Sequence, residues 1–164
     1  MKDIDTDTAS VKKLMGMAIR AEIDSNKIYT KIADKLKNPF LKEKFTLLAF
    51  EENKHRKILE KLYEIFFDTV DIKVPDKTDE SLLPSIEIKS SSSFVEILQQ
   101  AMNAEKAAED FYQSLSEKVQ NPQKKILIYL SKVEKSHYEI LKSELVLAQE
   151  FEDYAEKDID KVIT

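Results

Sequence analysis

The sequence predicts an all-α fold, a four-helix bundle made of two antiparallel hairpins joined by a long crossover. Three observations support this prediction. The chain of 164 residues contains one Gly, whereas an all-β fold of this size needs Gly at many tight turns. Two Asn-Pro pairs each divide one half of the chain into two segments. Within these segments apolar residues recur at intervals of three and four, which is the period of an amphipathic helix.

The four helices are placed by their capping signals. Asn38 and Asn121 are predicted N-cap residues, each with a Pro at the first helical position. Ser93-x-x-Glu96 has the pattern of a capping box. The short Asn-Pro turns force the helices on either side to run antiparallel. We expect a single domain, residues 1–164, with helices at about residues 10–37, 39–68, 93–119 and 122–150.

The two halves of the chain are copies of one unit. Glu22 recurs 83 residues later as Glu105, and the Asn-Pro pair recurs at the same offset. After the second Asn-Pro pair the offset falls to 82, so that Glu52 returns as Glu134. The chain is therefore a twofold duplication of a helical hairpin and not a longer repeat array.

A linker of about residues 69–92 joins the two halves. It contains Pro75 and Pro84 and ends at a run of four Ser residues, 90–93, a composition typical of a linker. At about 3.3 Å per residue it can span a helix about 40 Å long, so the third helix can run parallel to the second. The acidic tail, residues 151–164, is assigned no element.

Composition excludes several classes of function. The chain has no Cys, which excludes disulfides, thiol catalysis and cysteine-ligated zinc or iron–sulfur sites. The net charge is −5 and the basic residues form no stripe on the predicted helices, so we expect no nucleic-acid partner. The N-terminus is acidic, unlike a secretory signal, and no apolar run reaches about 18 residues. We therefore expect a cytoplasmic protein that does not cross a membrane.

Polar residues interrupt the apolar face of every predicted helix near its middle. The first and third helices carry one Glu on this face, and the second and fourth carry Glu-x-x-His. At 1.5 Å per residue, Glu22 and Glu52 lie about 24 and 21 Å from the turn at Asn38, and the second hairpin gives nearly the same heights. We therefore expect six side chains to meet at one level of the bundle: Glu22, Glu52, His55, Glu105, Glu134 and His137.

These six residues have the composition of a di-metal site. Four ionised carboxylates in an apolar core repel one another and lose their hydration, which costs many kcal/mol. Two divalent ions would balance the four charges, and two neutral imidazoles would complete the ligand set. Glu and His at i and i+3 lie on one helical face and can reach the same pair of ions. The alternative is a buried salt-bridge network without metal.

The pattern of one Glu from each of two helices and Glu-x-x-His from the other two resembles the ligand set of ferritin-like di-iron carboxylate bundles. Within that group the chain looks most like the rubrerythrin family over about residues 10–147, through the segments AIRAEIDSNKIYTKIADKL, FEENKHRKIL, AMNAEKAAEDFYQSL and KVEKSHYEIL. The resemblance implies a catalytic centre of two iron ions, with manganese or zinc as alternatives. Glu52 and Glu134 would bridge the ions. Each ion would also receive one terminal Glu and one His, from the set Glu22, Glu105, His55 and His137.

Two departures from the family pattern bear on function. Typical rubrerythrins carry a rubredoxin-type domain with four Cys, and this chain has no Cys, so electrons would come from an external donor. They also carry a further carboxylate three residues after the Glu of the third helix, where this chain has Ala108. Glu109 is about 40° from Glu105 around the helix and is a candidate to replace that carboxylate.

Neighbouring residues suggest supporting roles. Tyr29 and Tyr112 follow the terminal Glu residues by two turns, and we expect core aromatics that each make a hydrogen bond, with radical carriers as the alternative. If they act at the site, their hydroxyls would hold carboxylates in position. Ser25 and Ala108 are small either for packing or to leave an open coordination position for the oxidant. Glu51 is expected on a solvated face.

The resemblance implies an oxidoreductase of the di-iron peroxidase or ferroxidase type. We expect rubrerythrin-like scavenging of hydrogen peroxide or dioxygen, with a role in oxidative stress. Two alternatives stay open: ferritin-like oxidation and handling of iron, and a non-enzymatic bundle that metal stabilises. The expected partners are the oxidant, an external electron donor and a second copy of the chain in a homodimer.

Overall fold

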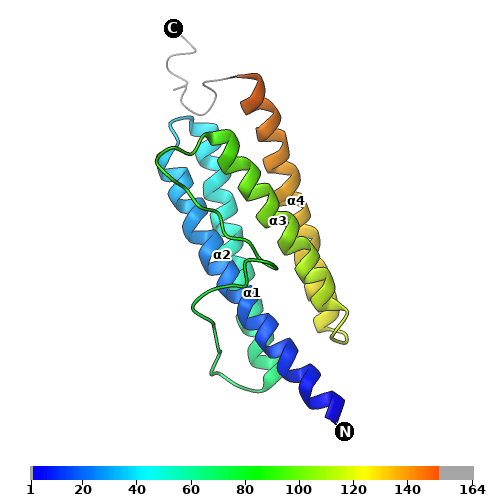
Figure 1. The fold of residues 1–164 in the computed structure, drawn as a ribbon. Coiled ribbons are helices and arrows are strands. Elements are labelled where there is room, and N and C mark those ends of the chain that lie inside the picture. The colour runs from blue at the N-terminus through cyan, green and yellow to red at the C-terminus, as the bar shows by residue number, and fades with distance from the viewer. Residues whose placement is uncertain (1, 152–164) are drawn as a thin grey trace.

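The computed structural model describes residues 2–151, and within that range the chain forms four helices (Figure 1). They are α1 (Lys2–Lys35), α2 (Pro39–Phe67), α3 (Phe94–Ser116) and α4 (Gln123–Glu150). α1 packs on α2 and α3 packs on α4 as antiparallel hairpins, which gives the ferritin-like four-helix bundle predicted from the sequence. None of the described helices has an apolar stretch long enough to cross a membrane.

α1 begins earlier than predicted, at Lys2 and not near Ser10. No Pro or Gly precedes Gly16, so no residue there stops the helix from extending toward the N-terminus. α1 ends at Lys35, before the Asn-Pro pair, because a residue that precedes Pro is disfavoured in the helical conformation. The predicted range of 10–37 was therefore wrong at its start and slightly too long at its end.

The two Asn-Pro turns differ. Asn38 caps α2 as predicted: its side chain accepts hydrogen bonds from two backbone N–H groups of the first turn, and Pro39 is the first helical residue. The prediction for Asn121 was wrong. Pro122 occupies the N-cap position of α4 without a side-chain cap, after a cis Asn121–Pro122 peptide bond. This difference lies close to the point where the repeat offset changes from 83 to 82.

The predicted capping box opens α3. The Ser93 hydroxyl accepts a hydrogen bond from the Glu96 backbone N–H, and the Glu96 carboxylate accepts one from the Ser93 N–H. α3 ends at Ser116, before the predicted end at Val119, and Lys118 closes the turn with a backbone hydrogen bond to Leu115.

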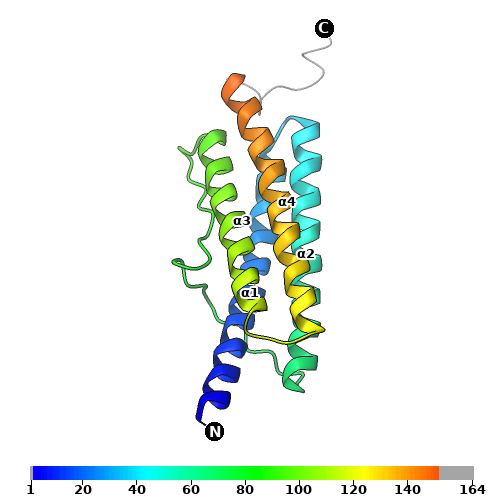
Figure 2. The same ribbon diagram turned by 90° about the vertical axis from the view of Figure 1, so that its right-hand side faces the viewer.

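Residues 68–93, called the crossover below, connect α2 at one end of the bundle to α3 at the other (Figures 1 and 2). As a result α3 runs parallel to α2, as the length of the linker predicts. The crossover lies along the side of the bundle formed by α1 and α3. The tail from residue 152 onward lies outside the described residues.

The crossover is held against the helices at two points. It crosses α1 at Gly16, where an added Cβ would lie 2.4 Å from the backbone oxygen of Lys73, so no larger residue fits without a shift of the backbone. Further along, the side chain of Gln100 in α3 both donates to and accepts from the backbone of Glu87.

The apolar core consists of two clusters at different heights of the bundle. The cluster nearer the start of α1 includes Met15, Ile19, Leu59, Tyr63, Leu127 and Leu130. The other includes Ile32, Phe45, Leu48, Leu98 and Leu141. On every helix, the Glu and His residues that the sequence predicts would meet lie between these two apolar clusters.

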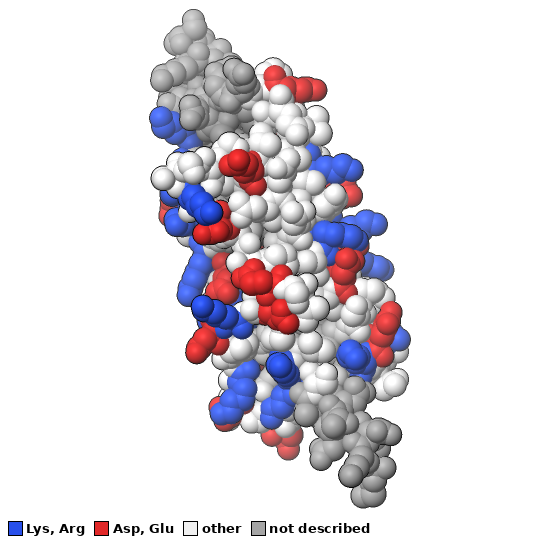
Figure 3. Space-filling model, viewed as in Figure 1, with Lys and Arg blue, Asp and Glu red and all other residues white. Residues whose placement is uncertain are grey.

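Charged side chains of both signs are mixed on the surface. On the face in Figure 3, Lys and Arg alternate with Asp and Glu over the described helices, and no continuous basic stripe crosses it. This face therefore lacks the concentrated basic surface that is typical of nucleic-acid-binding proteins.

Candidate metal centre

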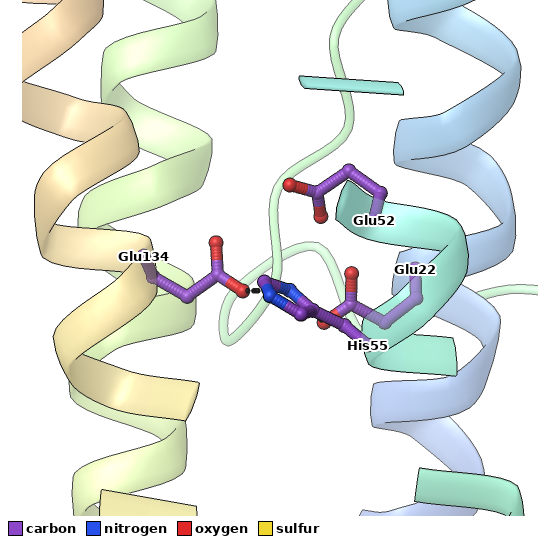
Figure 4. A group of neighbouring side chains, drawn as sticks. All are labelled: Glu22, Glu52, His55 and Glu134. Atoms are coloured by element: carbon purple, nitrogen blue, oxygen red, sulfur yellow. Dashed lines mark ion pairs between the residues drawn. The ribbon is translucent and has the colours of Figure 1, made fainter. Parts of the chain in front are cut away.

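Six polar side chains fill the level between the two apolar clusters, and they are the six that the sequence predicts would meet. We call them the carboxylate–histidine cluster: Glu22, Glu52, His55, Glu105, Glu134 and His137. None is more than 3% exposed. Figure 4 shows four of them pointing from α1, α2 and α4 into the space between the hairpins.

The cluster consists of two overlapping groups of four residues. Glu22 and His55 belong to one group, Glu105 and His137 belong to the other, and both groups include Glu52 and Glu134. In each group the four ligand-type atoms lie within 4.8 Å of one another. The arrangement therefore offers two adjacent metal positions that share two carboxylates.

The distances follow the twofold repeat of the sequence. His55 Nδ1 lies 2.8 Å from a Glu134 oxygen and 3.8 Å from a Glu22 oxygen. In the other half, His137 Nδ1 lies 2.9 Å from a Glu52 oxygen and 3.6 Å from a Glu105 oxygen. Among the cluster carboxylates, the Nδ1 atom of each His thus lies nearest to the shared Glu of the opposite hairpin. The two imidazole rings are nearly parallel, with centroids 5.6 Å apart.

The two tyrosines hold carboxylates across the bundle. Tyr29 of α1 donates its hydroxyl hydrogen bond to Glu105 of α3, and Tyr112 of α3 donates to Glu22 of α1. Burial and the nearby carboxylates raise the pKa of both phenols well above the ordinary value, so both remain protonated donors. The sequence predicts such a positioning role, but it does not show that each Tyr reaches the Glu of the opposite hairpin.

Glu51 is a site residue that the sequence analysis missed. Its carboxylate oxygen lies 2.6 Å from Nε2 of His137, although we expected Glu51 on a solvated face. With Nε2–H donating to Glu51, Nδ1 of a neutral imidazole presents its lone pair to the cluster. The repeat could not reveal this contact, because the position equivalent to Glu51 is Val133.

Glu109 does not join the cluster, so the suggestion that it replaces the missing carboxylate was wrong. Its carboxylate pairs with Lys106 at 3.2 Å on the same helix. A position one residue beyond Ala108 is turned about 100° around the helix, which carries the side chain away from the core. Glu144 is a further buried carboxylate outside the cluster, and it pairs with Lys44 of α2.

Burial makes the negative charges of the cluster unfavourable. It raises the pKa of Glu22 and Glu134 well above the ordinary value, and neighbouring carboxylates add to the shift. Burial also raises the pKa of Glu52 to about 8, again with help from neighbouring carboxylates. The metal-free cluster therefore retains protons that a metal ion would displace.

The pKa values of the other three members of the cluster are shifted in different directions. Burial favours the neutral acid of Glu105, but the adjacent His137 and the Tyr29 hydrogen bond hold the pKa below its ordinary value. Burial lowers the pKa of His55. Burial also acts to lower the pKa of His137, but the surrounding carboxylates outweigh it and raise that pKa far above the ordinary value.

The hydrogen bonding of the cluster is incomplete. Among the described residues, the buried side-chain nitrogen and oxygen atoms without a hydrogen-bond partner all belong to it: Glu22 Oε2, Glu52 Oε1, His55 Nδ1, both Glu134 oxygens and His137 Nδ1. Buried polar atoms normally have partners, and the residues that carry these six atoms all belong to the two groups of four ligand-type side chains. Oxygen and imidazole donors with a total carboxylate charge of −4 fit two divalent ions.

The comparisons with known proteins agree with this geometry. A hypothetical protein from Pyrococcus furiosus has 34% sequence identity to this chain and superposes with a TM-score of 0.76. The match covers 85% of this chain and 90% of that one. The curated proteins contain no match. The rubrerythrin family model matches residues 13–145, which include all six members of the cluster. The chain belongs to the rubrerythrin family.

Proposed function

We propose that the carboxylate–histidine cluster holds two iron ions and that the protein is an oxidoreductase that reduces hydrogen peroxide or dioxygen. The observation that carries this proposal is that two groups of four ligand residues share two carboxylates, and that every unpartnered buried side-chain atom among the described residues belongs to a member of these groups. Membership of the rubrerythrin family supports iron as the metal. Affinity alone would favour zinc, so the choice of iron rests on the carboxylate-rich donors and on the family.

The residues have distinct tasks in this proposal. Glu52 and Glu134, which belong to both groups, would be shared by the two ions; Glu22 and His55 would complete one ligand set, and Glu105 and His137 would complete the other. The Tyr29 and Tyr112 hydroxyls fix the terminal carboxylates, and Glu51 fixes the His137 ring. Two bound iron ions supply two electrons by changing between the ferrous and ferric states. The 164 residues contain no Cys for a rubredoxin-type electron donor, so the proposal assigns the electrons to an external reductant.

Anaerobic loading followed by rapid mixing tests the proposal. The metal-free protein is titrated with Fe(II) without oxygen and then mixed with hydrogen peroxide or with air in a stopped-flow spectrometer. We expect two irons per chain and an absorbance of protein-bound ferric iron that forms much faster than free Fe(II) oxidises. The Glu52→Ala variant should lose both the absorbance and the turnover with a reductant.

The same experiment separates the competing functions. Faster reaction with peroxide than with air identifies a peroxidase, and the reverse identifies an oxidase or ferroxidase. Ferritin-like iron handling predicts continued uptake of iron beyond two per chain. Stoichiometric binding without accelerated oxidation identifies a bundle that metal only stabilises, and that result would overturn the enzymatic proposal.

We also propose that the protein forms a homodimer and that it is cytoplasmic. The outer face of α2 exposes Leu47 and Phe50, at 52% and 56%, which is the kind of apolar surface that a second copy could cover. Native mass spectrometry of the metal-loaded protein measures the oligomeric state directly.

A further inference from the structure

A cavity of about 320 Å³ lies beside the carboxylate–histidine cluster, between α1, α3 and the crossover. Four members of the cluster form its inner end: Glu22, Glu52, Glu105 and Glu134. The Tyr112 side chain also lines it. The cavity therefore reaches the two metal positions from one side of the bundle.

Small side chains on the two helices create this space. α1 contributes Ala21 and Ser25, and α3 contributes Ala104 and Ala108. In each pair the residues are four apart, so they lie one turn above each other on the helix face that borders the cavity. Ala108 is the position where rubrerythrins have a further carboxylate, so the departure from the family pattern enlarges the cavity and removes a charge from it.

The outer wall of the cavity is mostly apolar, and Asp24, Thr78 and Ser85 are polar residues that also line it. The crossover covers the gap between α1 and α3 with Leu83, Pro84 and Ile86, and Ile28 of α1 borders the same space. Leu83 is 6% exposed, so this part of the crossover packs closely against the helices. Lys27 and Lys31 border the cavity from α1 and are exposed, which marks the side open to solvent.

The cavity is larger than hydrogen peroxide or dioxygen requires, and its lining is less polar than hydrogen peroxide alone would favour. Each of these molecules has two heavy atoms, while one water occupies about 30 Å³ in the liquid. An apolar cavity of about 150 Å³ is enough to hold a benzene ring. Small-molecule pockets of this size are usually apolar with a few polar groups that orient the ligand. A ligand with an apolar body and a reactive polar end would fit this cavity, with its body against the apolar side chains and its polar end toward the carboxylates.

We propose that the cavity binds organic hydroperoxides, with a compact alkyl or aryl group against Ala108 and Leu83 and the O–OH group toward the carboxylates. This inference rests on the proposed di-iron function and specifies its substrate class. The reaction breaks the O–O bond of R–O–OH, takes two electrons from the reduced metal centre and two protons from solvent, and yields R–OH and water. The external reductant then returns two electrons to the centre.

Binding to the metal-free protein tests the cavity without turnover. Isothermal titration calorimetry with 2-phenyl-2-propanol, the alcohol formed from cumene hydroperoxide, should give a Kd below about 1 mM. Ala108→Leu fills the cavity and should weaken binding at least tenfold. Ala107→Leu is the matched control, because Ala107 is the adjacent residue and does not line the cavity; its Kd should stay within about twofold. Ser25→Leu fills the cavity from α1 and replaces Ala108→Leu if that variant does not fold.

Turnover of the iron-loaded protein gives the second measurement. The ratio of kcat/KM for cumene hydroperoxide to kcat/KM for hydrogen peroxide should fall at least tenfold in Ala108→Leu and remain unchanged in Ala107→Leu. Reduction of hydrogen peroxide without reduction of cumene hydroperoxide, together with no binding of the alcohol, overturns this inference and leaves the proposed function standing. If the loaded protein reduces neither peroxide, the proposed function is wrong and the substrate assignment falls with it.

Discussion

Glu51 Oε2 lies 2.6 Å from Nε2 of His137, while Nδ1 of the same ring faces the carboxylate–histidine cluster. A carboxylate behind a ligating imidazole fixes the ring and its tautomer and makes the inner nitrogen a better donor. His55 has no equivalent, because the repeat places Val133 at the corresponding position. The two proposed metal positions are therefore inequivalent despite the twofold arrangement of their ligands.

Replacing Glu51 should weaken one metal position more than the other. In Glu51→Gln we expect the affinity of the position with His137 to fall by about 10- to 100-fold, the usual cost of losing such a partner. Anaerobic titration with Co(II), followed by its visible absorbance, measures the two binding steps separately. Glu43→Gln on the same helix is the control, since Glu43 is exposed and lies outside the cluster. An equal loss at both positions would contradict the inequivalence.

The shared carboxylates should matter more for metal stoichiometry than the terminal ones. Glu134 belongs to both groups of four, whereas Glu22 belongs to one. We therefore expect Glu134→Ala to lose both irons and Glu22→Ala to retain about one per chain. Metal analysis after anaerobic loading and desalting gives the stoichiometry, and circular dichroism checks that each variant is helical. A full complement of iron in Glu134→Ala would contradict the bridging role.

The free energy of unfolding of the metal-free protein should fall as the pH rises above 6.5. Burial keeps protons on Glu22, Glu52 and Glu134 in the folded state that the same groups lose in the unfolded chain. The folded state then binds more protons than the unfolded state, so raising the pH favours unfolding, and for Glu52 this continues to about pH 8. Each group contributes on the order of 1 kcal/mol per pH unit. The raised pKa of His137 acts in the same direction above pH 6.5.

Urea denaturation at several pH values measures this effect. The lowered pKa of His55 acts in the opposite direction, but only below pH 6.5, where the unfolded His gains a proton. Above pH 6.5 the change in stability therefore reports on the groups whose pKa is raised. Protein saturated with Mn(II) is the control: bound metal displaces the protons, so stability should no longer fall over this interval. A metal-free protein that becomes more stable from pH 6.5 to 8 would contradict the burial argument.

Gly16→Ala should destabilise the protein although Ala is the better helix former. The new Cβ would lie 2.4 Å from the backbone oxygen of Lys73 and would push the crossover away from α1. We expect a net loss of about 1–3 kcal/mol, because overpacking outweighs a gain of about 1 kcal/mol in helix propensity. Urea denaturation of the metal-loaded protein checks the size and sign. A gain in stability would show that the crossover does not press on α1 at this position.

The sequence by itself determined the number and order of the helices and the six residues of the cluster. Helical periodicity, the Asn38 cap and the Ser93 capping box are local properties, so neighbouring residues suffice to predict them. The height of each Glu and His follows from 1.5 Å per residue once the hairpin turns are known. This estimate of height does not depend on how the helices are rotated about their axes. It therefore remained correct although the N-cap prediction for Asn121 was wrong.

The tertiary structure decided which partners these residues have. That Tyr112 reaches Glu22, that Glu51 reaches His137 and that Glu109 turns outward depend on the rotation of each helix and the distance between the hairpins. The cavity beside Ala108 depends on the path of the crossover over α1 and α3. These contacts join residues far apart in the chain, and a rotation of one residue, about 100° on a helix, would exchange one partner for another. No local pattern fixes such a rotation, so only the packed structure could show them.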